Sequence, residues 1–108
     1  MEINYWKEKE GKANMHGIDA REVYHHEHAQ IMHLMIDPGK TVKPHKTPVD
    51  VVFVVLEGTA EFHIGDETQT ATKEAVIHSP ANIPHSIDNL KDEPVRLLVI
   101  KTPSPKNI

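Results

Sequence analysis

Cysteine is absent from this 108-residue chain, and glycine is scarce, with five residues. Without thiols the chain can form no disulfide, no thiolate zinc site and no cysteine nucleophile. A cysteine-free composition suits a reducing compartment, so we expect a cytoplasmic protein. The few glycines form no glycine-rich phosphate loop. The longest apolar run, Val51 to Leu56, is far shorter than the ~20 residues that a membrane span needs, and the polar start of the chain predicts no signal peptide.

Positive charge is also in short supply. The chain has 12 basic and 16 acidic residues, which gives a formal net charge of −4. It lacks the basic surface that a phosphate backbone requires and the polybasic clusters that anionic membranes attract. We therefore expect neither a nucleic-acid nor a membrane partner. Histidine, by contrast, is abundant, with nine residues.

The apolar pattern predicts short strands and no long helix. No apolar repeat has the helical period, whereas turn residues recur every ~8–12 residues between short apolar segments. This pattern is typical of an all-β sandwich or barrel, and the length suits one domain with one core. We divide the chain into an N-terminal arm with short strands (1–28), a barrel (29–101) and an extended C-terminal tail (102–108).

The faces of the expected strands differ. Residues 59–64 alternate, with Phe62 on the apolar side and His63 on the polar side. Residues 49–56 are apolar on both faces. An earlier strand places Ile31 and Met35 on its outer face. Uncovered apolar area of this kind predicts a contact between two copies of the chain, and therefore a homodimer.

Two segments resemble the two sequence motifs of the cupin family. In the first, Gly39 is followed after five residues by His45, and Gly58 closes the motif at the family's distance. In the second, Asn82 replaces a glycine, which fits because Asn tolerates positive φ. The positions that match the second motif directly are Pro80, His85 and Asn89. The resemblance covers about residues 29–101 and implies a double-stranded β-helix, or jelly-roll barrel.

The resemblance also implies a site inside the barrel. Cupins use three imidazoles and a carboxylate to hold a divalent transition metal such as Fe, Mn, Ni, Zn, Co or Cu, and imidazole suits these metals. Here Thr47 stands at the second histidine position and Val51 at the glutamate position. His45 and His85 are then the two metal ligands that remain.

Strand periodicity connects these residues to one place. Odd-numbered residues from 45 to 55 share a strand face, and in cupins that face points inward. We therefore expect the two histidines to meet in the barrel mouth, where they bind a small polar molecule. The expected ligand-binding residues are His45, Thr47, Val51, Phe53 and His85. A metal would need a third ligand, either Asp50, turned inward by a β-bulge, or His78.

Three functions remain open at this point. The protein is a small metallo-cupin enzyme, a non-enzymatic ligand-binding or sensory cupin without a metal, or a metal-independent isomerase or lyase. In the last case His45 or His85 would shuttle a proton. A further cluster, His25, His26 and His28, is more typical of an exposed strand than of a metal site. The sequence identifies no catalytic residue and no substrate.

Overall fold

A computed structural model describes residues 1–107 of the chain. Within that range the chain forms nine strands and two short 3₁₀ helices, and neither helix is long and apolar enough to cross a membrane. The helices are η1 (Trp6–Glu8) and η2 (Pro105–Asn107). The strands are β1 (Asp19–His26), β2 (Ala29–Ile36), β3 (Thr41–His45), β4 (Asp50–Glu57), β5 (Ala60–Ile64), β6 (Glu67–Ala71), β7 (Val76–Ser79), β8 (His85–Asp88) and β9 (Val95–Thr102).

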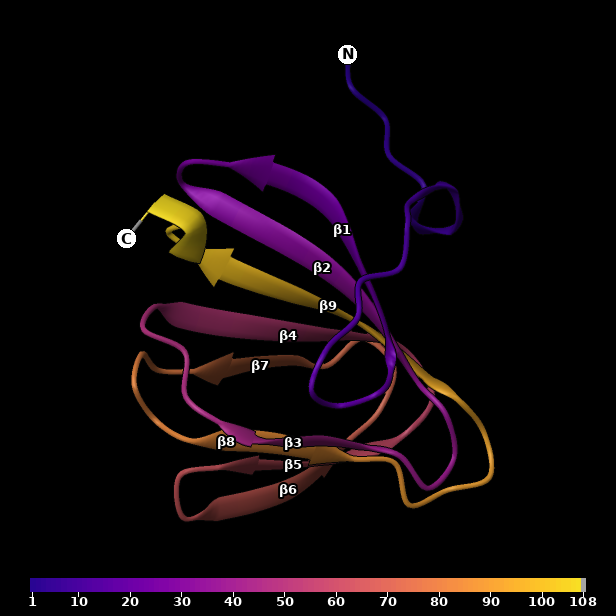
Figure 1. Ribbon diagram of the computed structural model, residues 1–108. Coiled ribbons are helices and arrows are strands. Elements are labelled where there is room, and N and C mark those ends of the chain that lie inside the picture. The colour runs from indigo at the N-terminus through magenta and orange to yellow at the C-terminus, as the bar shows by residue number, and fades with distance from the viewer. Residues whose placement is uncertain (108) are drawn as a thin grey trace.

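The strands form two antiparallel sheets that pack face to face (Figure 1). The five-stranded sheet has the order β1-β2-β9-β4-β7, and the four-stranded sheet has the order β3-β8-β5-β6. Most neighbours are not consecutive in the chain, as in a jelly roll. The prediction of an all-β double-stranded β-helix is confirmed. Of the expected C-terminal tail, η2 occupies the last described part, and residue 108 lies outside the described residues.

Alternating residues of both sheets fill the space between them. In β4 the inward side chains are Val51, Phe53 and Val55, each at most 2% exposed, whereas the outward Val52 and Val54 are half-buried. Their partners in β9 and β5 include Leu97 and Phe62. Burial of each such side chain contributes about 1.5–3 kcal/mol. The core therefore fixes which face of each strand points into the barrel.

The segment before the barrel is part of the same architecture. β1 pairs with β2 from Asp19↔Met35 to His26↔Ala29 and so forms the edge of the five-stranded sheet. Before β1, the backbone carbonyls of Trp6, Lys7 and Lys9 accept hydrogen bonds from Arg21. These contacts hold the N-terminal arm against the sheet.

His33 lies on the outer face of β2 beneath this arm. The Trp6 indole stacks on its ring at 4.1 Å between centroids, and only 1% of His33 is exposed. Arg96 donates a hydrogen bond to its Nε2. Burial, together with the positive charge of Arg96, lowers the pKa of His33 to about 4. The outer stripe of β2 is thus partly covered by the chain's own N-terminus.

The backbone conformation at two motif positions explains why Asn82 and Gly58 occupy them. Asn82 has φ 64°, the left-handed conformation that the family's glycine would adopt. Gly58 has φ 86°, and a Cβ there would lie 2.5 Å from the carbonyl oxygen of Pro94. A side chain at position 58 would therefore collide with the loop that leads into β9.

Candidate functional site

His45 and His85 meet at the open end of the barrel. They face each other in the β3–β8 pairing, and their Nε2 atoms lie 3.2 Å apart. The rings contact edge to face at 4.6 Å, and Phe53 packs edge to face on His85 at 5.3 Å. Strand pairing thus joins two imidazoles that are 40 residues apart in sequence.

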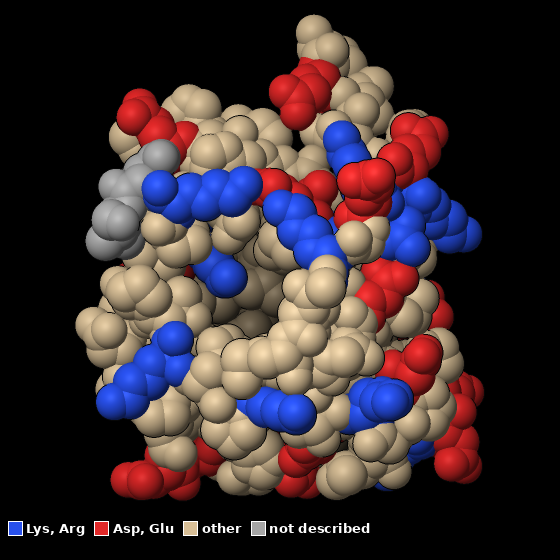
Figure 2. All heavy atoms as spheres, viewed as in Figure 1, with Lys and Arg blue, Asp and Glu red and all other residues tan. Residues whose placement is uncertain are grey.

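The pair forms part of the wall of a cavity of about 190 Å³. The lining combines hydrocarbon with a few polar groups: Asn14, His16, Ile18, Ala20, Met32, Leu34, Val42, His45, Phe53, His85, Val99 and Lys101. On the surface, Lys and Arg side chains lie around the opening (Figure 2). Of the expected ligand-binding residues, Thr47 and Val51 do not line this cavity. Val51 is buried in the core, and Thr47 is buried beside the turn at Asn82.

A chain of hydrogen bonds assigns the protons of the pair. The carbonyl oxygen of Lys43 accepts from His45 Nδ1 at 2.8 Å, so Nδ1 carries the proton of the neutral ring. His45 Nε2 is then an acceptor, and His85 Nε2–H donates to it. The remaining nitrogen, His85 Nδ1, accepts from the Ser79 hydroxyl at 2.8 Å. Every nitrogen of the pair has a partner while both rings are neutral.

His16 adds a third imidazole that no motif indicated. The Lys43 backbone N–H donates to His16 Nδ1 at 2.7 Å, and the ring lies 5.1 Å from that of His45. Its proton is therefore on Nε2. The loop that carries it is held by Asn14, whose side-chain amide donates to the carbonyl oxygens of Lys12 and Ile18. His16 precedes the family motifs, so only the fold of the arm reveals its position.

Burial favours the neutral form of His85 and of His16. It lowers the pKa of His85 to about 4, with help from the neighbouring His45, Lys101 and His16. Burial also lowers the pKa of His16, and the proximity of His45 and Lys43 adds to the effect. Lys101 has a lowered pKa for the same reason, the burial of its ammonium group. The cavity wall is thus rich in nitrogen and contains no carboxylate among its lining residues.

The two expected third ligands lie elsewhere. Asp50 and His78 project from the outer face of the five-stranded sheet, 3.7 Å apart, and their side chains are 56% and 58% exposed. The Asp50 carboxylate accepts from the Ala81 backbone N–H. The register shift between β4 and β9 falls at Val55 and Glu57, away from Asp50. No bulge therefore turns this carboxylate inward.

The cavity residues do not fit the metal that the family implies. A metal at the His45–His85 pair would have two protein ligands, whereas catalytic zinc sites have three. His16 does not supply the third ligand, because its Nε2 carries the proton and the donor atoms of the three rings do not all lie within 4.8 Å of one another. The Lys101 ammonium lies close enough to affect His85, and it would repel a cation. The site thus offers too few ligands for a metal ion, and its local positive charge opposes the binding of a cation.

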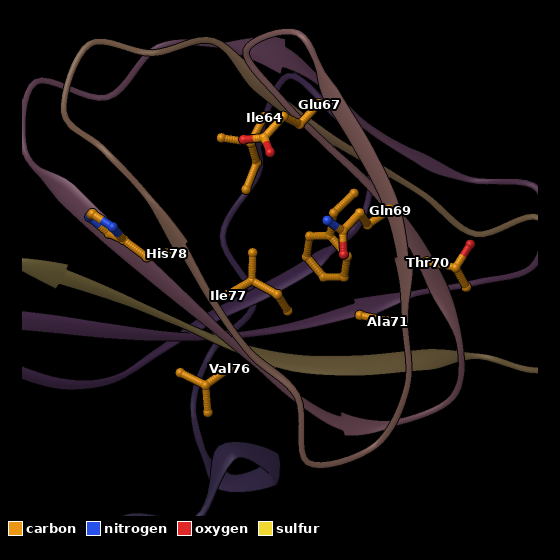
Figure 3. A pocket seen from close by; sticks show the side chains of 9 residues that line it. Ile64, Glu67, Gln69, Thr70, Ala71, Val76, Ile77 and His78 are labelled. Carbon is orange, nitrogen blue, oxygen red and sulfur yellow. The ribbon is translucent and has the colours of Figure 1, made fainter.

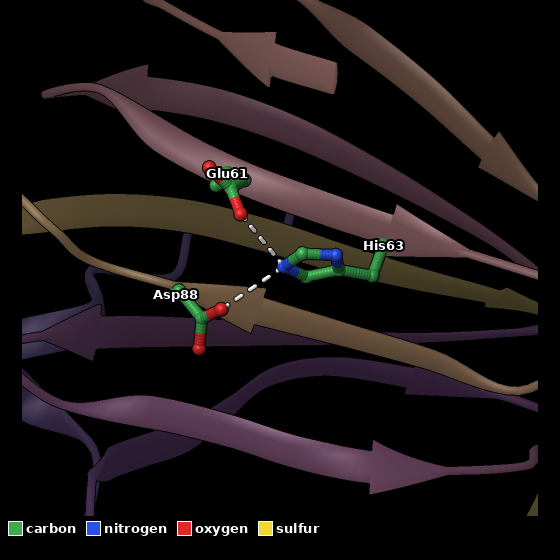
Figure 4. Close-up of side chains that lie close together, drawn as sticks. All are labelled: Glu61, His63 and Asp88. Carbon is green, nitrogen blue, oxygen red and sulfur yellow. Dashed lines mark hydrogen bonds and ion pairs between the residues drawn. The ribbon is translucent and has the colours of Figure 1, made fainter. Parts of the chain in front are cut away.

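A different group on the outer face of the four-stranded sheet has metal-ligand geometry. Glu61, His63 and Asp88 are the only three ligand side chains within residues 1–107 whose donor atoms all lie within 4.8 Å of one another. His63 Nε2 lies 3.1 Å from Glu61 Oε1 and 3.0 Å from Asp88 Oδ2 (Figure 4). His63 Nδ1 contacts the Thr68 hydroxyl, and the Thr41 hydroxyl donates to Asp88. This group could hold a metal ion.

Sequence reasoning placed His63 on the polar face but missed this group. Alternation along β5 puts Glu61 on the same face, which the sequence already shows. Asp88 joins them because β5 pairs with β8 in the register Glu61↔Asp88. That pairing is not readable from sequence spacing.

A second cavity, of about 300 Å³, opens between β5, β6 and β7 (Figure 3). Its floor is formed by apolar side chains such as Phe62, Ile77 and Ala71. Its polar residues, Glu67 and Gln69 among them, are exposed. It offers space but no buried group that could bind a proton or a charge. The histidine cluster at residues 25–28 is also exposed, at the β1–β2 hairpin, and does not line either cavity.

Fold and motifs together define the class. The family model for the cupin domain matches residues 32–101. The chain therefore belongs to the cupin family.

The chain is also similar to individual proteins and solved structures. The protein MJ0764 of Methanocaldococcus jannaschii is 25% identical over 83 residues, which are 76% of this chain and 72% of that one. Its crystal structure, described as an RmlC-like cupin with a double-stranded β-helix fold, has a TM-score of 0.77 and covers 91% of both chains. The TT1209 structure from Thermus thermophilus is 27% identical over 95% of this chain and 98% of that chain, with a TM-score of 0.82.

A structure titled as a predicted oxalate decarboxylase from Thermotoga maritima matches 94% of this chain and 98% of that chain, with a TM-score of 0.83. Its sequence identity is 19%, so this likeness concerns the fold alone. Cupins carry many activities on one barrel, and the function has to be argued from the site.

Proposed function

We propose that this cupin binds a small polar molecule in the barrel-mouth cavity without a metal ion. The observation that carries the proposal is the His45–His85 pair at the wall of a cavity otherwise lined mainly by hydrocarbon, in which His85 is buried and His45 is half-buried. Small-molecule sites have this composition, an apolar concavity with a few convergent polar groups that orient the ligand.

The size of the cavity limits the ligand. A cavity of about 150 Å³ holds a benzene molecule, so 190 Å³ suits a molecule of roughly six to eight non-hydrogen atoms. The pair can offer a ligand either an acceptor or a donor. A ligand that breaks the Nε2–Nε2 hydrogen bond can donate to His45 Nε2 or accept from His85 Nε2–H. The expected partner is thus a small molecule with at least one polar group and an apolar remainder.

The test is a screen of small alcohols, amides, carboxylic acids and sugars against the protein labelled at its histidines. Binding in the cavity should move the imidazole NMR signals of His45 and His85, and His45→Ala or His85→Ala should weaken that binding. The exposed His28 provides the matched control, since His28→Ala leaves the cavity intact. If no class of compound moves the His45 and His85 signals, the proposal fails.

A second function is favoured by a separate observation, the Glu61, His63 and Asp88 geometry. Two carboxylate oxygens and one imidazole nitrogen on one face suit a divalent cation such as Zn²⁺. The test is a Zn²⁺ titration of wild-type protein and of His63→Gln. Wild-type binding that survives the substitution would place the zinc at other residues.

We also propose that the protein acts as a homodimer. The support is a shallow apolar groove on the outer face of the five-stranded sheet, lined by Tyr24, Ile31, Leu56 and Leu98 beside the Trp6–His33 stack. Light scattering at micromolar concentration tests it, and a monomer mass would refute it. Leu98→Glu should convert a dimer to a monomer, because it buries a charge in the contact.

A further inference from the structure

Lys101 is a cation inside the mouth of the barrel. It lies on β9 opposite Gln30 of β2 and Val51 of β4, both of which are buried on the inner face. The alternation that points Val95, Leu97 and Val99 into the core therefore points Lys101 into the cavity, which it lines. Most lysines avoid such positions, because burial of an ammonium group costs free energy unless it is paired.

No counter-charge compensates this ammonium within the described residues. No hydrogen bond or ion pair joins the Lys101 side chain to any side chain that the structure describes, and the cavity lining has no carboxylate. An acidic residue on the neighbouring part of β1, Glu22, already accepts hydrogen bonds from Lys12, Lys106 and Gln30. The site is thus short of one negative charge.

His16 offers a second donor to the same space. Its Nδ1 accepts from the Lys43 backbone N–H, so the proton sits on Nε2. No described group accepts a hydrogen bond from that Nε2–H, and the ring lines the cavity. An ammonium and a free imidazole N–H that line one cavity are donors suited to a carboxylate, and charge-assisted hydrogen bonds of this kind are the strong ones.

We propose that the ligand of the barrel-mouth cavity is a small organic anion, whose carboxylate is bound by Lys101 and His16. Its apolar remainder packs against Phe53, Met32 and Leu34. Lys101 is then the specificity-determining residue of the site. The inference rests on the proposed function and names the ligand class for it.

The experiment compares two probes of equal size, butyrate and butyramide, which differ in charge. Each is titrated into the wild type, Lys101→Met, Lys101→Arg and the control Lys73→Met, which alters an exposed lysine. The readout is the dissociation constant from the His45 and His85 imidazole signals. Butyrate should bind the wild type at least about tenfold more tightly than butyramide, the size of one charge-assisted hydrogen bond.

The variants separate the possible results. Lys101→Met should abolish the preference for butyrate, Lys101→Arg should keep part of it, and Lys73→Met should behave as the wild type. Equal binding of both probes, or a butyrate preference that survives Lys101→Met, overturns the anion inference and leaves the proposed function in place. If only neutral compounds bind, the anion inference is also overturned, and the proposed function again stays in place. The absence of any signal change at His45 and His85, with every compound class, overturns both.

Discussion

The two histidine groups on the four-stranded sheet lie on opposite faces and have opposite surroundings. On the inner face, His45 and His85 contact each other and His45 also contacts His16. Lys101 lines the same cavity, and no carboxylate is among its lining residues. On the outer face, His63 lies between the carboxylates of Glu61 and Asp88, with all three side chains 27–31% exposed. One sheet thus carries a nitrogen-rich site and an oxygen-rich site back to back.

The comparison shows that the neighbours of a histidine decide what it binds. Inside, burial and positive neighbours favour the neutral imidazole, and the site lacks negative charge. Outside, two carboxylates supply negative charge and hard oxygen ligands, which suit a cation. The family motif marks His45 and His85 as metal ligands. These residues lie on the inner face, where the positive charge of Lys101 makes binding of a cation less favourable than on the outer face.

Removal of the inner pair should have the largest effect. His85→Ala deletes a ring that packs on Phe53 and His45, and it leaves the Ser79 hydroxyl without its acceptor. We expect a loss of about 2–4 kcal/mol in the free energy of unfolding, from the enlarged cavity and the unpaired hydroxyl. Urea unfolding measures it. His28→Ala, at an exposed site, should change stability by less than about 0.5 kcal/mol, and an equally small loss for His85→Ala would contradict the packing described here.

Acidification should weaken the fold through the buried imidazoles. The pKa values of His33 and His85 are lowered to about 4, below the ordinary value of 6.5. Between these values the unfolded chain binds protons that the folded chain does not, so stability is lost as the pH falls from 7 towards 4. We expect on the order of 2 kcal/mol for each histidine, measured by urea unfolding between pH 7 and pH 4.5.

A substitution assigns this pH dependence. His33→Gln keeps an acceptor for Arg96 but cannot titrate, so it should remove about half of the loss. His28→Gln should retain all of it. The carboxylate of Glu22 contributes little to this loss above pH 4.5. Burial opposes its ionisation, but hydrogen bonds from Lys106 and Lys12 lower its pKa from 4.5 to about 2, so its stabilising effect is lost mainly below pH 4.5. An unchanged pH dependence in His33→Gln would show that folding does not lower the pKa of His33.

Zinc should distinguish the two faces directly. Zn²⁺ is expected to move the imidazole signals of His63 and to leave those of His45 and His85 in place. Zinc in excess of its dissociation constant should stabilise the fold by about 1–3 kcal/mol through mass action, seen as a higher melting temperature that Asp88→Asn reduces. Shifts at His45 and His85 at equally low zinc concentrations would reverse the assignment of the faces.

The smallest effect concerns Lys101 in the absence of ligand. Lys101→Met removes a half-buried cation and keeps the apolar stem, so the free protein should gain about 0.5–1 kcal/mol of stability. Chemical denaturation of the ligand-free protein measures this. A destabilised Lys101→Met would mean that the ammonium group has a structural partner, and it would weaken the case for a ligand at that position.

Much of the fold was predictable because it depends on local patterns. Alternation marked Phe62 as internal, and the spacing of Gly39, His45, His85 and Asn89 indicated a cupin barrel. The candidate third metal ligands were less predictable. Asp50 and His78 were candidates for the metal because of their sequence proximity to motif positions, but strand parity places both outside. Asp50 stays outside because no bulge interrupts β4 there, and His78 stays outside because it pairs with the outward Val52; local patterns indicate neither.

The amino-acid sequence by itself determined the all-β class, the inward faces of the strands and the identity of the two motif histidines, because these follow from residue types at periods that any strand must obey. Tertiary structure alone decided that His16 and Lys101 join that pair and that Asp88 joins Glu61 and His63. Those neighbours come from loops and from strands distant in the chain. Their contacts depend on pairing register and on the path of the N-terminal arm, which long-range packing selects.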